Sequence, residues 1–316
     1  MATDKQRNRF KRMVHRLDLW QQRHVFTGFC YAVVKKYGDD QAGYLAALLS
    51  YYGFISLFPL LIVATSAIQI VAQGNPELRD QFLDSATSYF PAIGHNLAES
   101  INTPSKSGIA LVVALLITLY GARGVALVIQ HAQNHIWAVS RPKRAGFPWS
   151  LLRGFSIIFW GGMGLILAAS LSGYAAAASH PWPLRILLAF MSFAVLFLVF
   201  WGIFTFGSSA RKRPLASIPG AIFAAIGLVV LQAIGGYVVG HQLRSQTGLN
   251  AQFAIVLAML FWLYLQAQVF IYAIELNSVR VYRLWPRAIE PRPPLPADER
   301  AYELYKRREV FTPNKR

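Results

Sequence analysis

Residues 184–206 read LRILLAFMSFAVLFLVFWGIFTF, and the one charged side chain in this run, Arg185, stands at its edge. A helix that crosses the hydrocarbon core of a bilayer needs about 20 such apolar residues. A surface helix of a soluble protein carries polar residues on the face that meets water. This stretch therefore predicts a membrane-spanning helix, and it decides the fold of the whole chain.

Five further stretches have the same character. We expect spans at about 43–72, 108–130, 151–178, 184–206, 215–240 and 253–276. The strands of a membrane β-barrel alternate in polarity over about 10 residues, whereas these runs are continuously apolar. Helices are the other way to satisfy every backbone group in lipid. The expected fold class is therefore all-α, a polytopic membrane helical bundle with six transmembrane helices.

The composition of the chain agrees with lipid as its solvent. Charged residues make up 14% of the sequence and hydrophobic residues 55%, whereas a soluble domain is about a quarter charged. A single cysteine, Cys30, excludes an intramolecular disulfide framework and cysteine-based metal clusters. Residues 1–42 are polar and basic where a cleavable signal peptide needs an apolar run, so the first span is expected to act as an uncleaved signal anchor.

The distribution of Lys and Arg predicts the orientation in the membrane. Of the 31 basic residues, 26 lie before the first span, in the connections after the second and fourth spans, and after the sixth. Four lie in the alternate segments, and Arg123 lies inside a span. We therefore expect both termini to lie in the cytoplasm. The net charge of +17 then indicates anionic membrane lipids as partners, and nucleic-acid binding is the less favoured interpretation.

The region before the first span, residues 1–42, predicts a helix at the inner surface. Its apolar residues recur at helical spacing: Phe26, Phe29, Cys30, Val33 and Tyr37. This pattern is typical of an amphipathic interfacial helix. A helix packed against the bundle is the alternative.

Two segments beyond the spans carry their own signals. In the external segment 74–107, Asn75 followed by Pro76 is typical of a helix start and predicts a short external helix. The basic tail, 279–316, is rich in proline and is expected to be extended and solvated. A short charged helix near Ala297 to Val310 is the alternative.

Small residues predict where helices of the 43–278 membrane domain touch. Gly164, Ala168, Ser172 and Ala176 form one ridge of the third span, and such ridges let helix backbones approach closely in lipid. Pro59 interrupts the first span and predicts a helix kink.

The sequence lacks the signatures of common catalytic sites. It contains no G-x-x-x-x-G-K-[ST], no G-x-S-x-G and no H-E-x-x-H motif. No acidic residue occurs between Glu99 and Glu275. His131 and His135 share a helix face but lack a third metal ligand nearby in sequence, so interfacial hydrogen bonding is the favoured interpretation. We expect no enzymatic activity, metal or cofactor.

Arg123 is the main candidate for a functional residue. It lies about 10 Å below the inner surface at the usual helical rise, where a charge marks a functional site by default. It could instead form a structural ion pair, for which Glu275 is the acidic candidate at similar depth. The other polar candidates in the inner half of the bundle are Ser50, Tyr51, Tyr52, Gln266, Gln268 and Asn277. Together these residues predict a polar cavity that opens inward and binds substrate.

Several motifs resemble the YihY/BrkB family of bacterial inner-membrane proteins, in particular its YhjD-like branch. Residues 46–61 read AALLSYYGFISLFPLL, similar to the family's A-L-A-Y-Y-x-x-x-S-L-F-P-L-L signature. Residues 261–264 (FWLY) and 274–277 (IELN) look like its W-L-Y and G-A-E-L-N elements, with Ala273-Ile274 in place of G-A.

The resemblance implies six spans, a location in the bacterial plasma (inner) membrane and no settled activity. Members of the family have been suggested to move lipids or related envelope molecules, so a transporter or flippase-like protein for a lipid or other amphipathic envelope anion is the first hypothesis. A non-catalytic membrane scaffold for envelope enzymes is the second. Members have also been labelled as ribonucleases, which the missing catalytic constellation argues against. A homo-oligomer or envelope-protein partners stay open.

Overall fold

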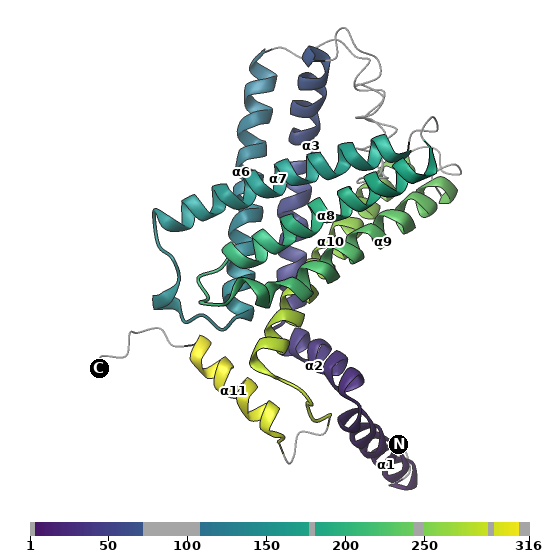
Figure 1. The fold of residues 1–316 in the computed structure, drawn as a ribbon, viewed down its shortest axis with the longest axis vertical. Coiled ribbons are helices and arrows are strands. Elements are labelled where there is room, and N and C mark those ends of the chain that lie inside the picture. Colours follow the sequence, from purple (N-terminus) through teal and green to yellow (C-terminus); the bar gives the residue numbers. More distant parts are fainter. Residues whose placement is uncertain (1–3, 72–107, 177–180, 243–248, 290–293, 310–316) are drawn as a thin grey trace.

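The computed structural model describes residues 4–71, 108–176, 181–242, 249–289 and 294–309, and every regular element in these ranges is a helix (Figure 1). In chain order the helices are α1 (Asp4–Arg23), α2 (Val25–Asp39), α3 (Ala42–Val71), α6 (Gly108–Ile136), the short η1 (Arg141–Lys143), α7 (Trp149–Ala176), α8 (Trp182–Phe206), the short η2 (Pro214–Ser217), α9 (Ile218–Gln242), α10 (Leu249–Tyr282) and α11 (Pro296–Arg308). The predicted external helix, within 74–107, lies outside the described residues.

Five stretches of these helices are long and apolar enough to cross a membrane. They are Leu115–Ile136, Trp149–Tyr174, Trp182–Phe206, Pro214–Gly235 and Val256–Tyr282. The all-helical membrane fold is thereby confirmed. Helix α3 runs for 30 residues and is helical through Pro59, but its side chains are described only as far as Leu57. The count of six spans and the kink at Pro59 therefore stay predictions.

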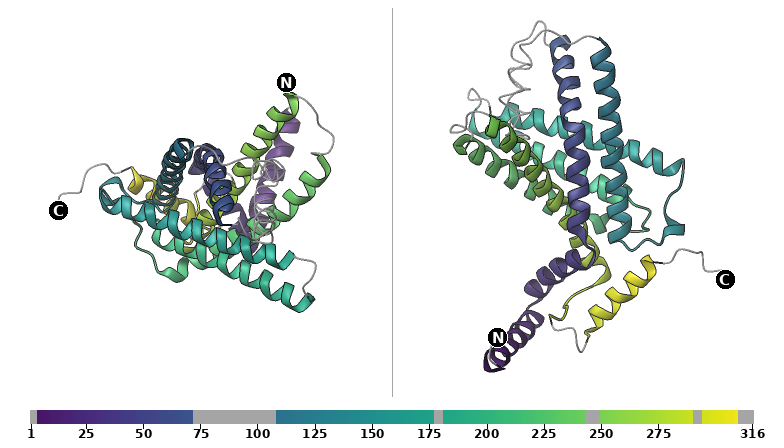
Figure 2. Two further views of the ribbon diagram at one scale, coloured as in Figure 1. Left: turned by 90° about the horizontal axis from the view of Figure 1, so that it is seen from above. Right: turned by 180° about the vertical axis from the view of Figure 1, so that it is seen from behind.

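The long helices form pairs of sequence neighbours. Helices α3 and α6 lie side by side, and α7 to α10 cross this pair at an angle (Figures 1 and 2). Helix α7 packs along α8, and α9 packs along α10. For the α7–α8 and α9–α10 pairs the antiparallel arrangement follows from the short connections, because a chain that has just left the bilayer re-enters beside its last helix.

Glycine sets the contact between α3 and α6. A Cβ atom at Gly121 would lie 2.5 Å from the Cβ and 2.9 Å from the Cα of Ser56. At Gly124 it would lie 2.2 Å from Cδ1 of Tyr52. These two positions accept no larger residue without separating the helices, which is the usual role of small residues between helices in lipid.

The small-residue ridge predicted for the third span faces α8. A Cβ at Gly164 would lie 2.0 Å from Cγ2 of Val199. The hydroxyl of Ser192 donates to the carbonyl of Ala168 at 2.9 Å and lies 2.9 Å from the hydroxyl of Ser172. The prediction is confirmed for these three ridge positions, while the side chain of Ala176 lies outside the described residues.

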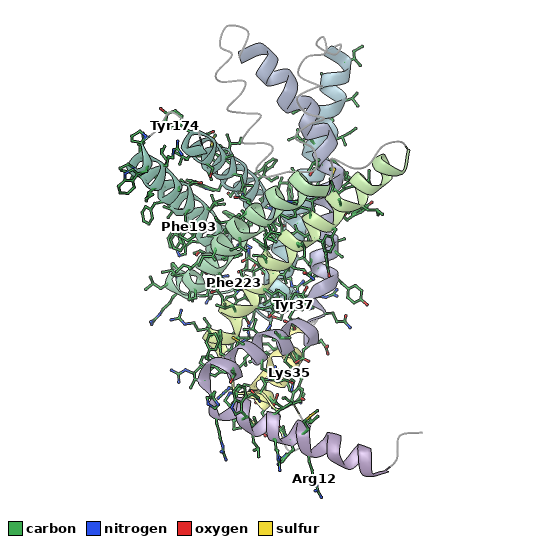
Figure 3. All side chains as sticks on the ribbon, turned by 90° about the vertical axis from the view of Figure 1, so that its right-hand side faces the viewer. Arg12, Lys35, Tyr37, Tyr174, Phe193 and Phe223 are labelled. Atoms are coloured by element: carbon green, nitrogen blue, oxygen red, sulfur yellow. The ribbon has the colours of Figure 1, made fainter. Side chains whose placement is uncertain are left out.

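Helices α1, α2 and α11 gather at one end of the molecule, together with the end of α10. Figure 3 shows Arg12 and Lys35 at this end and Tyr174 at the opposite end. We call it the basic end. Helix α2 buries Ala32 and Val33 in an apolar cluster with α10 and α11, while its Phe26 is 78% exposed. Packing of one face of α2 is thus observed, and contact of the other face with the membrane surface stays a prediction.

The tail differs from the favoured expectation of a solvated segment. Residues 296–308 form α11, which buries Ala297, Ala301 and Leu304. The physical reason is a set of ion pairs between residues far apart in the sequence, which no local pattern of prolines and charges reveals.

The glycine contacts predict how two matched substitutions differ. We expect Gly121→Ala to destabilise the protein by about 1–3 kcal/mol, the usual cost of overpacking, because the backbone of Ser56 blocks the added methyl group. Gly162→Ala on α7 meets nothing within 4 Å and should be neutral or stabilise the helix by up to about 1 kcal/mol. Thermal unfolding of the two purified variants in one detergent measures the difference; equal midpoints would contradict the assigned contact.

Candidate functional site

A central cavity lies among the long helices of the bundle. Its volume is about 390 Å³, and α3, α6, α7, α8, α9 and α10 all contribute to its wall. Small residues leave this space open, among them Gly53, Gly161, Ala126 and Ala224. A cavity of this size falls in the range of ligand-binding pockets.

The wall of the cavity is apolar with a few polar groups. Ser50 and Ser56 from α3 and Gln266 from α10 line it. The hydroxyl of Ser50 donates to the carbonyl of Leu260 at 3.1 Å, and that of Ser56 donates to its own helix at the carbonyl of Gly53 at 2.9 Å. Such a wall suits the hydrocarbon part of a ligand better than a hydrated ion.

Two of the residues predicted from the sequence therefore reach the cavity, Ser50 and Gln266. Tyr52 instead packs on Gly124 between α3 and α6, and Tyr51 is exposed. Asn277 is buried and holds the start of α9: its Oδ1 accepts from the backbone N–H of Gly220 at 2.8 Å.

Arg123 does not line the cavity, although Ala122 and Val125 beside it do. Its side chain is exposed on α6. Within the described residues, Arg123 and Glu275 form no ion pair with each other; the cation bound to Glu275 is Lys36.

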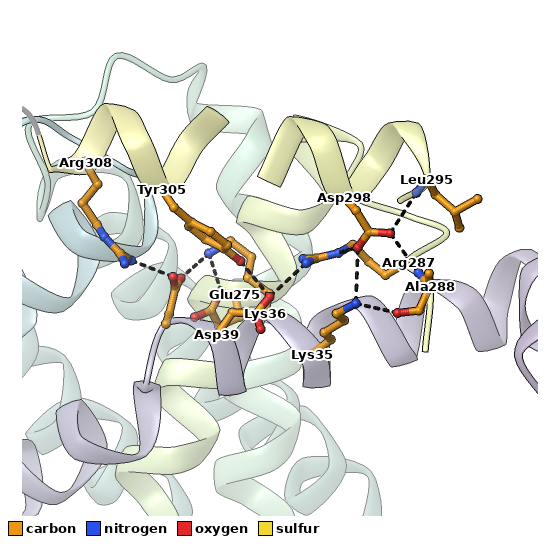
Figure 4. A network of polar contacts seen from close by, with 11 residues as sticks. Lys35, Lys36, Asp39, Glu275, Arg287, Ala288, Leu295, Asp298, Tyr305 and Arg308 are labelled. Atoms are coloured by element: carbon orange, nitrogen blue, oxygen red, sulfur yellow. Dashed lines mark hydrogen bonds and ion pairs between the residues drawn. The ribbon is translucent and has the colours of Figure 1, made fainter. Parts of the chain in front are cut away.

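Lys36 is the centre of a buried polar network at the basic end (Figure 4). Its ammonium group lies 2.8 Å from Oε2 of Glu275, and it also pairs with Asp40 and donates to the carbonyl of Ile136 at 3.2 Å. The Lys36 side chain is only 1% exposed. Burial alone would lower the pKa of Lys36, but the charges of Glu275 and Asp40 outweigh burial and raise it. The lysine is therefore charged at neutral pH and ties α2 to α10.

Arg287 is the second centre of this network. Its guanidinium group is fully buried; it pairs with Asp298 and lies 2.9 Å from Oδ2 of Asp39. Asp298 also accepts from the backbone N–H of Ala288 at 3.1 Å and of Leu295 at 3.2 Å. Burial would raise the pKa of Asp298, but the bond from Arg287 and these two N–H donors lower it. Through Arg287 the start of α11 is fixed to α2.

The two histidines singled out from the sequence take part in this end of the molecule. Nε2 of His135 lies 2.9 Å from Nη1 of Arg308 and 3.2 Å from the carbonyl of Asp40. The ring of His131 stacks on that of His135 at 6.0 Å. Among the described residues no three His, Cys, Asp or Glu side chains come together as metal ligands.

Sequence reasoning missed Lys36, Arg287 and Asp298 as members of a network. Lys36 and Glu275 are 239 positions apart, so no motif joins them. The available signal was the small number of carboxylates at the basic end: Asp39, Asp40 and Glu275 stand among many cations, and a buried carboxylate requires one of those cations as a partner.

Comparisons with known proteins place these residues in a wider group. A family model described as "Virulence factor BrkB" matches residues 33–294. The inner membrane protein YhjD of Escherichia coli (strain K12) is 24% identical over 289 residues, which cover 84% of this chain and 85% of that protein. No solved structure matches.

The network predicts a graded response to charge removal. Lys36→Met leaves Glu275 and Asp40 buried without their shared cation, and breaking a buried pair typically costs about 3–5 kcal/mol. Adding Glu275→Gln should recover part of this loss, because Arg308 still pairs with Asp40 at 2.7 Å. Lys35→Met is the matched control, because Lys35 is 20% exposed and Asp298 stays paired with Arg287 when Lys35 is removed. Unfolding of the four proteins in detergent tests the order; a double variant weaker than Lys36→Met alone would refute the pairing argument.

Proposed function

The chain belongs to the BrkB/YihY family of inner-membrane proteins, and from that premise we propose that it is a transporter or flippase-like protein for a lipid or other amphipathic envelope anion. The observation that carries the proposal is the central cavity of about 390 Å³ between the long helices. A scaffold that only organises other proteins has no use for such a space, because membrane helices associate through close packing. The cavity therefore favours transport over the scaffold alternative.

The chemistry around the cavity supports an amphipathic anion as the substrate. Its wall is almost entirely apolar, which suits hydrocarbon. The stretch from Gly108 to Ile274, which supplies most of that wall, contains basic residues and no carboxylate. Basic side chains of this stretch would attract a negatively charged substrate, and no carboxylate in it would repel that charge.

The orientation that we propose follows from the basic end. Both termini lie in the cytoplasm, α3 also crosses the membrane and brings the number of spans to six, and the exposed face of α2 rests on the membrane surface. The excess of Lys and Arg in residues 1–42 and after Glu275 supports this placement. The lipid-facing surface is apolar: Phe190 on α8 and Ile109 on α6 are 67% and 79% exposed.

Arg123 fits this proposal in a different way from the one expected from sequence. Its guanidinium group lies outside the cavity, on the outer surface of α6. We propose that it meets an anionic head group from the lipid side, because an arginine facing hydrocarbon extends toward phosphate groups. The protein is proposed to act without a catalytic step, as a passage and not as an enzyme.

Filling the cavity tests the proposal. A Cβ at Gly161 meets only Cδ1 of Ile203, at 3.7 Å, so Gly161→Leu should fold and occupy part of the space. In vesicles of phosphatidylethanolamine and phosphatidylglycerol, we expect the wild-type protein to speed the movement of fluorescent phosphatidylglycerol between leaflets, measured by dithionite quenching. Gly161→Leu should return the rate to that of protein-free vesicles, whereas Gly38→Leu should not, because Gly38 is an exposed position of α2 with nothing within 4 Å of its Cβ position.

Two results would count against transport. One is a wild-type rate equal to that of protein-free vesicles, with and without an imposed proton or sodium gradient. The other is a Gly161→Leu rate equal to that of the wild-type protein, since the cavity would then have no part in the movement.

A further inference from the structure

A second hollow lies between α7 and α8. This groove has a volume of about 1020 Å³ and is lined by the two helices and by the connections at their basic ends. Ile157, Val199 and Ile203 line both the groove and the central cavity. Only one layer of side chains therefore separates the groove from the interior of the bundle.

The walls of the groove are apolar over the depth of one leaflet. Trp160, Met163 and Leu167 of α7 and Leu198 and Phe206 of α8 line it, and each of these five side chains is exposed. Along α8 the lining extends from Val195 to Phe206, roughly 16 Å at the helical rise of 1.5 Å per residue. This length is close to half of the hydrocarbon core, which is about 30 Å thick.

The end of the groove nearest η1, which we call its mouth, is basic. Lys143 and Arg153 line it. Nη1 of Arg153 donates to the hydroxyl oxygen of Ser209 at 2.8 Å, and the backbone N–H of Ala145 donates to the same oxygen at 3.0 Å. Ser209 thus holds Arg153 at the mouth, with other N–H groups of the guanidinium left for a ligand.

Lys212 adds a third basic group beside this mouth. Its ammonium group lies 3.1 Å from the hydroxyl of Ser208 and 4.5 Å from the centre of the Trp137 ring. Burial and, next, the charge of Arg153 lower the pKa of Lys212 to about 7. An anion bound at the mouth would raise the pKa of Lys212 again, because its negative charge would stabilise the charged ammonium group.

These cations lack the carboxylates that the rest of the basic end supplies. Lys36 and Arg287 each have two acidic partners. In the part of the chain that the structure describes, no ion pair includes Lys143, Arg153 or Lys212. A cluster of cations at the end of an apolar groove is complementary to a molecule with an anionic head and a hydrocarbon chain.

We propose that the α7–α8 groove binds one anionic phospholipid, with its phosphodiester group between Arg153 and Lys143 and an acyl chain along the two helices. The lipid comes from the leaflet at the basic end. If this lipid is the transported substrate, it would be held beside the central cavity, and that role rests on the proposed function. Its binding in the groove does not depend on transport.

Native mass spectrometry of the full-length protein tests the site without transport. The protein is incubated in detergent with equal amounts of phosphatidylglycerol and phosphatidylcholine that share the same acyl chains. We expect the wild type to retain phosphatidylglycerol preferentially. Lys143→Gln and Arg153→Gln should each reduce that preference, by roughly tenfold for a lost charged hydrogen bond. Gly202→Leu should weaken retention of both lipids, because Gly202 lines the groove and has nothing within 4 Å of its Cβ position.

The matched control is Arg213→Gln, which removes one charge at the same end but outside the groove. It should keep the wild-type preference. The side chain of Lys143 is exposed, so Lys143→Gln stays informative if Arg153→Gln misfolds. Excess glycerol phosphate should not displace the lipid if the acyl chain contributes; displacement would identify a site for free phosphate instead.

Equal retention of the two lipids would overturn the proposal, and so would a preference that Arg213→Gln removes as strongly as Lys143→Gln does. A third contrary outcome is a dimer that Gly202→Leu converts to monomer, because the groove would then bind a second copy of the chain. Binding in the groove without movement of lipid between leaflets would reject the proposed function and keep the site. Movement that survives Lys143→Gln and Gly202→Leu would keep the proposed function and reject the role of the groove lipid as its cargo.

Discussion

The buried ammonium group of Lys36 is the contact on which the rest of the basic end depends. It lies on the second helix of the chain and pairs with Glu275 near the end of α10 and with Asp40. Such a buried pair adds little stability over apolar packing, but leaving one member alone is costly. Its effect is therefore to fix one arrangement: α2 meets α10 at a single register, and Arg287 and α11 then follow from that placement.

Close contact in one part of the bundle is accompanied by open space in another. At Gly121, Gly124 and Gly164 the helices touch without room for a methyl group. At Gly53, Gly161 and Gly202, which line the two hollows, an added Cβ atom would meet at most an ordinary contact. Glycine thus serves two purposes here, and only the position of the neighbouring helix distinguishes them.

The sequence was sufficient to predict the elements that depend on local pattern. Continuous apolar runs predicted the membrane helices, and the spacing of Gly164, Ala168 and Ser172 predicted the face that meets α8. It was insufficient where rotation about a helix axis decides the outcome. Arg123 and Glu275 were expected at a similar depth, but Lys36 contacts both Glu275 and the carbonyl of Ile136 at the end of α6. Arg123 lies about 20 Å before that level along α6, at the usual helical rise. Nor does depth tell which way a side chain points: Arg123 turns outward, and Glu275 turns toward Lys36. The groove was missed for the same reason, because it needs two helices to be placed side by side.

Helix α10 extends without interruption for 34 residues, about 51 Å at the usual rise and well beyond the hydrocarbon thickness of about 30 Å. One part of this rod lines the central cavity at Leu263 and Phe270, and its far end carries Glu275 into the network with α2. A rod of this kind behaves as a lever. A change of its tilt in response to bilayer thickness would therefore move the assembly of α2 and α11 together with the wall of the cavity.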